Sequence, residues 1–263
     1  MNEMSRKPEA EVAQSRRTIV LRQGRGRQGG TTTLDLLIQL ARAEGRPVLV
    51  GDGDRNNSSL ASFYPPGTDG GASQPATGET EDVKDWITAS VAEAIRLGSS
   101  LVIDLGGGDR VMEEYGRDLG LVEFCEAKGF NPLGLFFCGP EESDLHHILS
   151  LWRADYFRPS RSVVVFQEYL VPRGRTPSGA FDKLMGSPEM EQLLTDGVQF
   201  VFLPRLPCME EVRKLGIGFA DAAAGKPGTE GKPLDPVRQF MVEQWIGKVR
   251  KEFERIGATE WLP

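Results

Sequence analysis

The sequence predicts an α/β fold of three layers, in which a mainly parallel sheet of about seven strands has helices on both faces. Residues 18–52 contain an apolar strand, a stretch of helical period and a second apolar strand within fewer than 40 residues, which is typical of a parallel strand–helix–strand unit. Further apolar strands follow as far as residue 203, and several end in polar residues. Such strand ends are where ligands of open α/β folds bind.

The composition predicts one globular domain at 17–263. Of the 263 residues, 39% are hydrophobic and 26% charged, and the net charge of −7 repels nucleic acid overall. No run of about 18 apolar residues occurs and the first residues are polar, so we expect no transmembrane segment, no signal peptide and a cytoplasmic location. Cys125, Cys138 and Cys208 lack metal-site spacing, so we expect buried free thiols.

The first elements follow from local composition. Residues 1–16 have no hydrophobic period and are expected to form a flexible arm. A strand at 18–21 leads into a glycine-rich loop, a helix at 31–44 that ends before Gly45, and a second strand at 47–52. Residues 64–80, rich in Pro, Gly, Ser and Thr, are expected to form a flexible surface excursion.

The later elements follow from the same periods. Strands are predicted at 99–104, 133–138, 162–167 and 198–203, and helices at 82–97, 115–124, 141–152, 181–194, 209–215 and 235–256. The last helix begins with Asp235 as cap and Pro236 in its first turn. Its polar face mixes acids and bases, which favours packing on the sheet over a membrane surface. Its apolar stripe is Val237, Phe240, Met241, Trp245, Val249, Phe253 and Ile256.

The loop before the first predicted helix has the features of a phosphate-binding loop. Against the pattern G-x-x-x-x-G-K-[ST], Gly24 and Gly29 match, Gly30 replaces the lysine and Thr31 supplies the hydroxyl of a Mg²⁺ ligand. Loop amides and the positive helix end suit phosphate oxygens without a side-chain cation. The missing lysine normally contacts the β- and γ-phosphates, so its loss affects hydrolysis more than binding. The loop's arginines that could replace it are Arg22, Arg25 and Arg27. Taken alone, the loop could also be an ordinary tight turn.

Aspartates follow two of the predicted strands. Asp52 and Asp54 come at the end of the strand at 47–52, where a polar turn is the alternative interpretation. Asp104 ends the strand at 99–104 and precedes three glycines, which is the form of a Walker B strand whose aspartate supports Mg²⁺. Its position about 75 residues after the glycine loop strengthens that interpretation.

Together these motifs resemble the ParA/MinD family of deviant-Walker P-loop ATPases, of the SIMIBI class, over residues 18–224. The family's K-G-G-x-G-K-T-T-T aligns with residues 25–33, so that its signature lysine falls on Arg25, its second glycine on Arg27 and its Walker lysine on Gly30. Leu203-Pro204-Arg205 resembles the late strand and proline that flank the adenine. Gln167 lies where the family often carries a base-reading asparagine.

The resemblance implies a P-loop NTPase fold that binds ATP or ADP with Mg²⁺. It assigns nucleotide binding to Gly24, Gly26, Arg27, Gln28, Gly29, Gly30, Thr31, Thr32, Gln167 and Pro204, catalysis to Arg25 and Asp54, and the metal to Thr31, Asp54 and Asp104. It further implies a nucleotide-gated homodimer, in which Arg25 reaches the partner's nucleotide, and weak or absent ATPase activity.

Within the family, the sequence looks most like the plasmid mobilisation and conjugal-transfer group. The features are the turn from Asp104 to Asp109, a helix with Tyr115 and Phe124, and Gly139-Pro140 after the next strand. This implies a role in plasmid or DNA partition or in conjugal mobilisation, with a protein partner from such a machine.

Two other functions stay open: a pseudo-ATPase interaction scaffold that binds no nucleotide, and a loop that binds another anion such as a phosphorylated metabolite. The stretch 153–175 reverses the sign of the net charge, with five arginines against two acids and aromatic residues between them. It is either a solvated loop whose aromatics enter the core or a surface that contacts DNA phosphates nonspecifically through Arg173 and Arg175.

Overall fold

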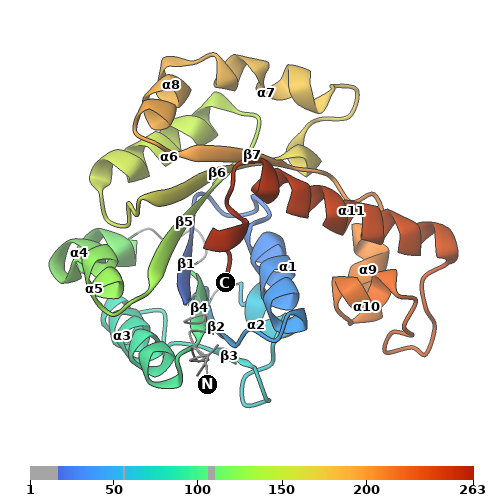
Figure 1. The fold of residues 1–263 in the computed structure, drawn as a ribbon, viewed down its shortest axis with the longest axis horizontal. Coiled ribbons are helices and arrows are strands. Elements are labelled where there is room, and N and C mark those ends of the chain that lie inside the picture. The colour runs from blue at the N-terminus through green and yellow to red at the C-terminus, as the bar shows by residue number, and fades with distance from the viewer. Residues whose placement is uncertain (1–16, 56, 106–109) are drawn as a thin grey trace, which may run out of the picture.

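The computed structural model describes residues 17–55, 57–105 and 110–263, and in these residues seven parallel strands form one sheet of order β3-β2-β4-β1-β5-β6-β7 (Figure 1). The predicted arm at 1–16 and the turn at 106–109 lie outside the described residues. The strands are β1 (Thr18–Gln23), β2 (Val48–Asp52), β3 (Ala72–Ser73), β4 (Ser100–Asp104), β5 (Asn131–Cys138), β6 (Arg161–Gln167) and β7 (Gln199–Leu203). The α/β class and the mainly parallel sheet are confirmed.

Strand β3 corrects the interpretation of residues 64–80 as only a surface excursion. Ala72 and Ser73 pair in parallel with Val50 and Gly51 of β2, and Ala72 is buried. Two residues are too few to show an alternating pattern in the sequence. The edge strand is therefore specified by its neighbour rather than by its own composition.

Helices connect successive strands and continue after β7. They are α1 (Gly30–Ala43), α2 (Ser59–Phe63), α3 (Thr80–Leu97), α4 (Arg110–Leu119), α5 (Leu121–Ala127), α6 (Glu142–Ala154), α7 (Pro177–Met185), α8 (Pro188–Thr195), α9 (Met209–Leu215), α10 (Phe219–Ala223) and α11 (Pro236–Arg255), with 3₁₀ turns η1 (Glu168–Leu170) and η2 (Thr259–Trp261).

Two of the predicted helices are each divided into two. The helix predicted at 115–124 breaks at Gly120, which has a positive φ of 58°. The helix predicted at 181–194 breaks at Gly186, because Ser187 caps a new helix through the backbone N–H of Met190 and Pro188 takes its first position.

The two faces of the sheet bury different sets of side chains, as the alternation along each strand requires. Val20 and Leu135 face α1, α9, α10 and α11, whereas Leu21 and Phe136 belong to the opposite face, where α3 to α8 pack. Arg22, one residue beyond Leu21, returns to the face that α1 covers. The helices thus form the two outer layers that the sequence predicts.

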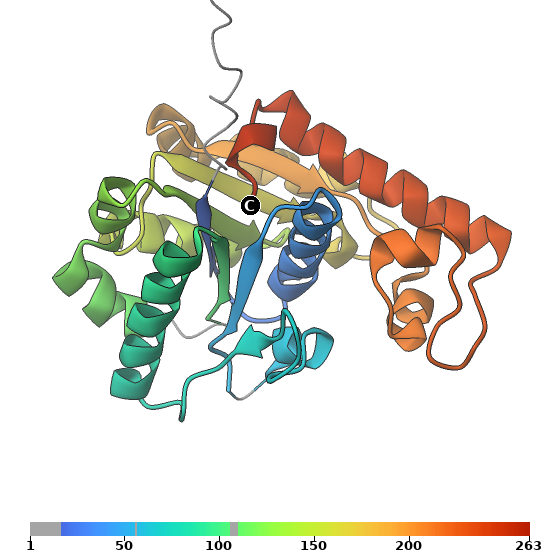
Figure 2. The ribbon, with the colours of Figure 1, turned by 60° about the horizontal axis from the view of Figure 1, so that its bottom comes forward.

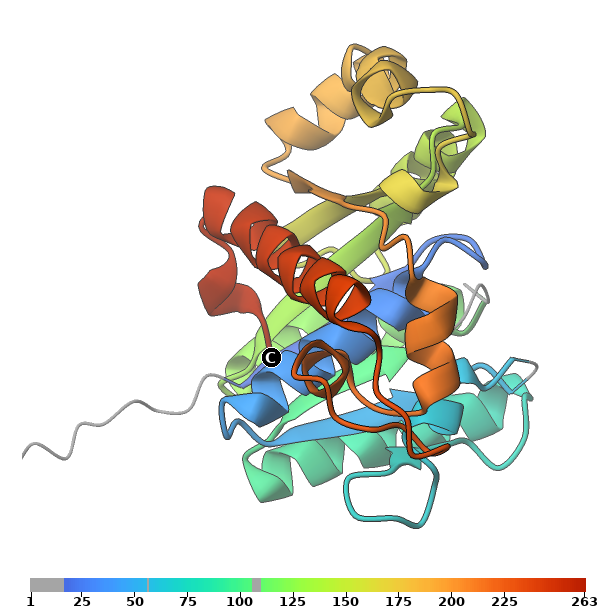
Figure 3. The same ribbon diagram turned by 90° about the vertical axis from the view of Figure 1, so that its right-hand side faces the viewer.

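Helix α11 corrects the prediction that its whole apolar stripe packs on the sheet. Trp245, Val249 and Phe253 are buried, but Val237 and Phe240 are 64% and 59% exposed. The N-terminal half of α11 extends beyond the strands (Figure 2), with α9 and α10 beneath its first turns (Figure 3). A helical period identifies the apolar face but not how far the neighbouring element reaches along it.

The register places three charged residues at one edge of the sheet. Leu21 of β1 pairs with Ile103 of β4, so Arg22 lies beside Asp104, and Asp52 of β2 pairs with Asp104 directly. The order β2-β4-β1 makes these strands neighbours although they are not consecutive in the chain. Within the described residues, no helix is long and apolar enough to cross a membrane.

Candidate functional site

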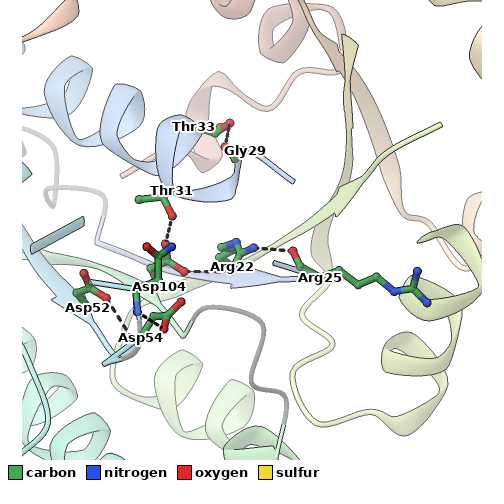
Figure 4. A network of polar contacts seen from close by, with 9 residues as sticks. Arg22, Arg25, Gly29, Thr31, Thr33, Asp52, Asp54 and Asp104 are labelled. Carbon is green, nitrogen blue, oxygen red and sulfur yellow. Dashed lines mark hydrogen bonds and ion pairs between the residues drawn. The ribbon is translucent and has the colours of Figure 1, made fainter. Parts of the chain in front are cut away.

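The start of α1 and the end of β4 meet at the carboxyl ends of the strands. The Thr31 hydroxyl donates a 2.6 Å hydrogen bond to Oδ2 of Asp104, which is buried (Figure 4). The glycine loop and Asp104 therefore converge at the carboxyl ends of the strands. The hydroxyl and the carboxylate present two oxygen ligands at one point.

The loop between β1 and α1 is held in a conformation that needs glycine. Gly24 and Gly29 have φ of +119° and +73°, and a Cβ on Gly24 would lie 2.9 Å from the Phe137 carbonyl oxygen. Arg27 also has a positive φ, of 63°, which costs about 1–2 kcal/mol for a residue with a side chain. The Tyr169 hydroxyl donates a 2.6 Å hydrogen bond to the Arg27 carbonyl, so η1 stabilises this conformation of the loop.

Arg22 fills the space beneath the start of α1. Only 4% of it is exposed, and its Nη1 donates to Oδ1 of Asp104 at 3.2 Å while its Nη2 donates to the Arg25 carbonyl at 2.7 Å. A Cβ on Gly30 would lie 1.9 Å from Arg22 Nε. In the sequence, Arg22 is only one of three candidate cations; its place directly after the buried run at 18–21 was the available signal.

The two aspartates after β2 have different surroundings. Asp52 is buried and accepts hydrogen bonds from the backbone N–H groups of Asp54, at 3.1 Å, and Ala61, at 2.7 Å, which ties β2 to α2. Burial raises the pKa of Asp52 from 3.8 to about 6, with a smaller contribution from the negative charges of Asp104 and Asp54. Asp54 is half-buried and accepts from the Asn57 N–H at 3.0 Å.

A cavity of about 540 Å³ opens beside the loop. Four predicted nucleotide-binding residues line it: Gly29, Thr32, Gln167 and Pro204. Gln167 donates from Nε2 to the Thr33 hydroxyl at 3.1 Å, and Trp245, also in the lining, donates from Nε1 to the Pro204 carbonyl at 2.8 Å. The lining includes Arg205, which the sequence reasoning did not single out as a site residue, and Arg173, which it assigned to DNA.

The other predicted nucleotide-binding residues lie in the loop itself. Gly26 is exposed, and a Cβ there would meet nothing within 4 Å. Gln28 is buried, and among the described residues its Oε1 has no hydrogen-bond partner. Gly30 is buried at the first position of α1.

Comparisons with known proteins establish the fold. No family model matches the sequence, and no curated protein does. Among solved structures, apo McdA from Cyanthece aligns at 14% identity over 89% of this chain and 100% of that chain, with a TM-score of 0.50. The fold is that of the ParA/MinD-type P-loop proteins. The turn at 106–109 on which the mobilisation-group resemblance partly depends lies outside the described residues.

Two further structures share this likeness. A chain of the MinC:MinD cell division protein complex from Aquifex aeolicus aligns at 12% identity over 88% of this chain and 96% of that chain, with a TM-score of 0.49. The signal recognition particle receptor FtsY from Elizabethkingia anophelis aligns at 12% identity, with a TM-score of 0.48. That alignment covers 88% of this chain and 66% of the FtsY chain, just under two thirds of its length.

In this ParA/MinD-type fold, Arg25 lies apart from the loop interior. Its Nη1 donates to the Ser143 hydroxyl at 3.0 Å and to Oδ1 of Asp144 at 3.2 Å, at the start of α6. Figure 4 shows the side chain directed away from Thr31 and Asp104. The structure therefore brings Arg22, and not Arg25, to Asp104 within the chain.

The arginine-rich stretch 153–175 divides into structural and exposed parts. Trp152 and Phe157 are buried, and the Arg158 guanidinium lies 4.3 Å from the centroid of the Trp152 ring and 3.3 Å from Asp196. The interpretation that aromatics enter the core therefore holds for Trp152 and Phe157, but not for Tyr169, which is 41% exposed. Arg173 and Arg175 are exposed, as expected from the loop composition.

Proposed function

We propose that the chain binds ATP or ADP in the loop at 24–32 and the adjoining cavity. The observation that carries the proposal is the hydrogen bond between Thr31 and Asp104 beside a cavity lined by Gln167 and Pro204. The phosphates would lie against the loop amides and the N-terminus of α1, where unpaired N–H groups and the helix dipole favour anions. Gln167 and Pro204 would contact the base.

The residues present fit a magnesium ion. Mg²⁺ prefers oxygen ligands, which the Thr31 hydroxyl, Asp104 and Asp54 supply. Arg22 offsets the charge of Asp104, but Asp52 and Asp54 add two further carboxylates at this end of the strands, and the repulsion between the aspartates adds to burial in raising the pKa of Asp52; a cation there would be favoured. When bound, the ion neutralises phosphate charge. Asp54 would orient the attacking water.

Hydrolysis is proposed to be weak, because position 30 carries no lysine. In a nucleotide-gated homodimer, Arg25 of one copy would act at the other copy's nucleotide. Its guanidinium is half-exposed and held by Asp144 at the surface, from where it can reach outward. We assign such a dimer to plasmid or DNA partition or conjugal mobilisation in the cytoplasm, with nonspecific DNA contact through Arg173 and Arg175 and a protein partner from such a machine.

One observation favours the pseudo-ATPase scaffold as a second function. Arg22 already pairs with Asp104, so the charge of that carboxylate is balanced within the chain, and Arg22 fills the space under Gly30. A loop stabilised in this way can hold its shape without a ligand.

Calorimetric titration of the full chain with ATP and Mg²⁺ tests the proposal, with ADP and inorganic phosphate as separate titrants. We expect micromolar binding of both nucleotides, and a marked loss in Thr31→Val. The matched control is Thr88→Val, which removes an exposed hydroxyl from α3. Silence at millimolar nucleotide supports the scaffold, and phosphate binding without nucleotide preference supports the phosphorylated metabolite. Light scattering with and without ATP tests the dimer.

A further inference from the structure

The position at which a P-loop carries its lysine is closed to any side chain here. A Cβ on Gly30 would lie 1.9 Å from Nε, 2.4 Å from Cδ and 3.0 Å from Cζ of Arg22. Gly30 does not have a positive φ, unlike Gly29, so its backbone conformation does not require glycine. Glycine is also the poorest helix former after proline. The reason for glycine at position 30 is therefore the volume that Arg22 occupies.

Arg22 cannot easily move aside. Its guanidinium is fixed at both ends, by Asp104 on β4 and by the Arg25 carbonyl in the loop, and the side chain is almost wholly buried. Freeing it would leave the Asp104 carboxylate with less compensation in a buried setting, which is costly. Restoring lysine at position 30 alone is therefore not expected to rebuild a working loop.

The Arg22 cation lies next to the group that marks the phosphate site. Arg22 Nη1 binds one oxygen of Asp104 and the Thr31 hydroxyl binds the other. The cation and the hydroxyl thus flank the same carboxylate. Among the described residues, Arg22 Nε has no hydrogen-bond partner, and an unpaired buried N–H costs about 1–3 kcal/mol. A phosphate oxygen that reached this buried atom would satisfy it.

We propose that Arg22 supplies the phosphate-binding cation of this loop, having taken over from β1 the role that a P-loop assigns to the residue at position 30. This inference rests on the proposed nucleotide binding and specifies its ligand as the phosphate chain of a nucleoside di- or triphosphate. A guanidinium is always charged and offers several donors in a fixed plane, which suits phosphate oxygens.

The first test is a stability cycle that needs no nucleotide. Gly30→Ala is expected to lower the denaturation midpoint of the wild type, because the new methyl group meets Arg22. In an Arg22→Ala background the same change is expected to be neutral or stabilising, because the space is free and alanine favours helix. If Gly30→Ala shifts the denaturation midpoint equally in both backgrounds, the steric coupling between positions 22 and 30 is refuted.

The second test measures ATP binding by calorimetry. Arg22→Ala and Arg22→Met both remove the charge, and Met keeps most of the volume, so one variant remains usable if the other folds poorly. We expect each to bind ATP about tenfold to a hundredfold more weakly, as for loss of a hydrogen bond to a charged group. Arg96→Ala, which removes an exposed positive charge from α3, is the control and should bind like the wild type.

The double variants decide whether the role has moved between positions. Arg22→Ala with Gly30→Lys should regain affinity to within a few-fold of the wild type, whereas Arg22→Met with Gly30→Lys should not, because methionine still fills the space. If Arg22→Ala with Gly30→Lys binds ATP no better than Arg22→Ala, the claim that Arg22 has taken over the role of position 30 is refuted. If the wild type binds ATP and the Arg22 variants bind it equally well, this inference fails while the proposed function stands. If the wild type binds no nucleotide, both fail.

Discussion

Gly29→Ala is the sharpest test of the loop conformation. Gly29 is the residue before α1 and has φ +73° and ψ 11°, in the left-handed region. A Cβ there would lie 2.7 Å from Tyr169 Cε1 and 3.2 Å from Gln167 Cδ. Alanine at this position is therefore both conformationally strained and sterically blocked.

The expected cost is the sum of two terms. The left-handed conformation costs a residue with a Cβ about 1–2 kcal/mol. Relieving the contact requires Tyr169 to swing out, which breaks its hydrogen bond to the Arg27 carbonyl and loses about 1 kcal/mol, or requires strain of about 1–3 kcal/mol if the ring stays. The molecule takes the less costly of these two routes, so we expect Gly29→Ala to lower the free energy of unfolding by about 2–3 kcal/mol.

Gly26→Ala is the matched control, because Gly26 lies in the same loop without a positive φ, and a Cβ added there would have no neighbour within 4 Å. Its free energy of unfolding should stay within about 0.5 kcal/mol of the wild type or rise slightly. The assay is urea denaturation without nucleotide, followed by circular dichroism. If the two variants unfold at the same urea concentration, the loop does not have this conformation and its contact with Tyr169 is refuted.

Three further outcomes are expected. Asp52→Asn should remove a pH dependence of the free energy of unfolding, because burial raises the pKa of Asp52 from 3.8 to about 6. The stabilising contribution of Asp52 is complete below pH 3.8 and is lost as pH rises through 6, about 3 kcal/mol in all. If the free energies of unfolding of wild type and variant, plotted against pH, stay parallel from pH 4 to 7, this expectation is contradicted. ATP should change the intrinsic fluorescence through Trp245, which lines the cavity, and Trp245→Phe should remove most of that change in a titration; an undiminished signal would place the nucleotide elsewhere. With ATP present, a random DNA duplex should bind with an affinity that falls with salt, and the slope of log affinity against log salt should be about −0.9 per phosphate neutralised. The Arg173→Ala, Arg175→Ala double variant should reduce both affinity and slope; if it keeps both, these arginines do not contact DNA.

Local patterns were sufficient for the elements that carry the site. Strand β1, the glycine loop and the start of α1 are adjacent in the chain, and the β-branched run, the glycines and the helical period each report on their own segment. Asp104 at the end of β4 was predictable for the same reason. Its contact with Thr31 followed because parallel strands deliver their carboxyl ends to one edge of the sheet.

Residues that act through distant neighbours were beyond such patterns. The sequence offered Arg22, Arg25 and Arg27 as replacement cations, and the family resemblance favoured Arg25. The packing separates them differently: Arg22 contacts Asp104, Arg25 contacts Asp144 and Arg27 is exposed. Likewise, the stripe of α11 showed which side is apolar but not that Val237 and Phe240 are exposed.

By itself, the sequence determined the fold class, the loop and the aspartates at the strand ends, because these depend on short-range composition and on a period of two or of 3.6 residues. Only the tertiary structure decided that Arg22 closes position 30. That contact requires β1 to lie between β4 and β5 in a register that sets Leu21 against Ile103, across 82 residues of chain. Strand order and register are long-range properties that arise from packing the whole sheet. They place Arg22 under Gly30, at the position where a P-loop carries its lysine.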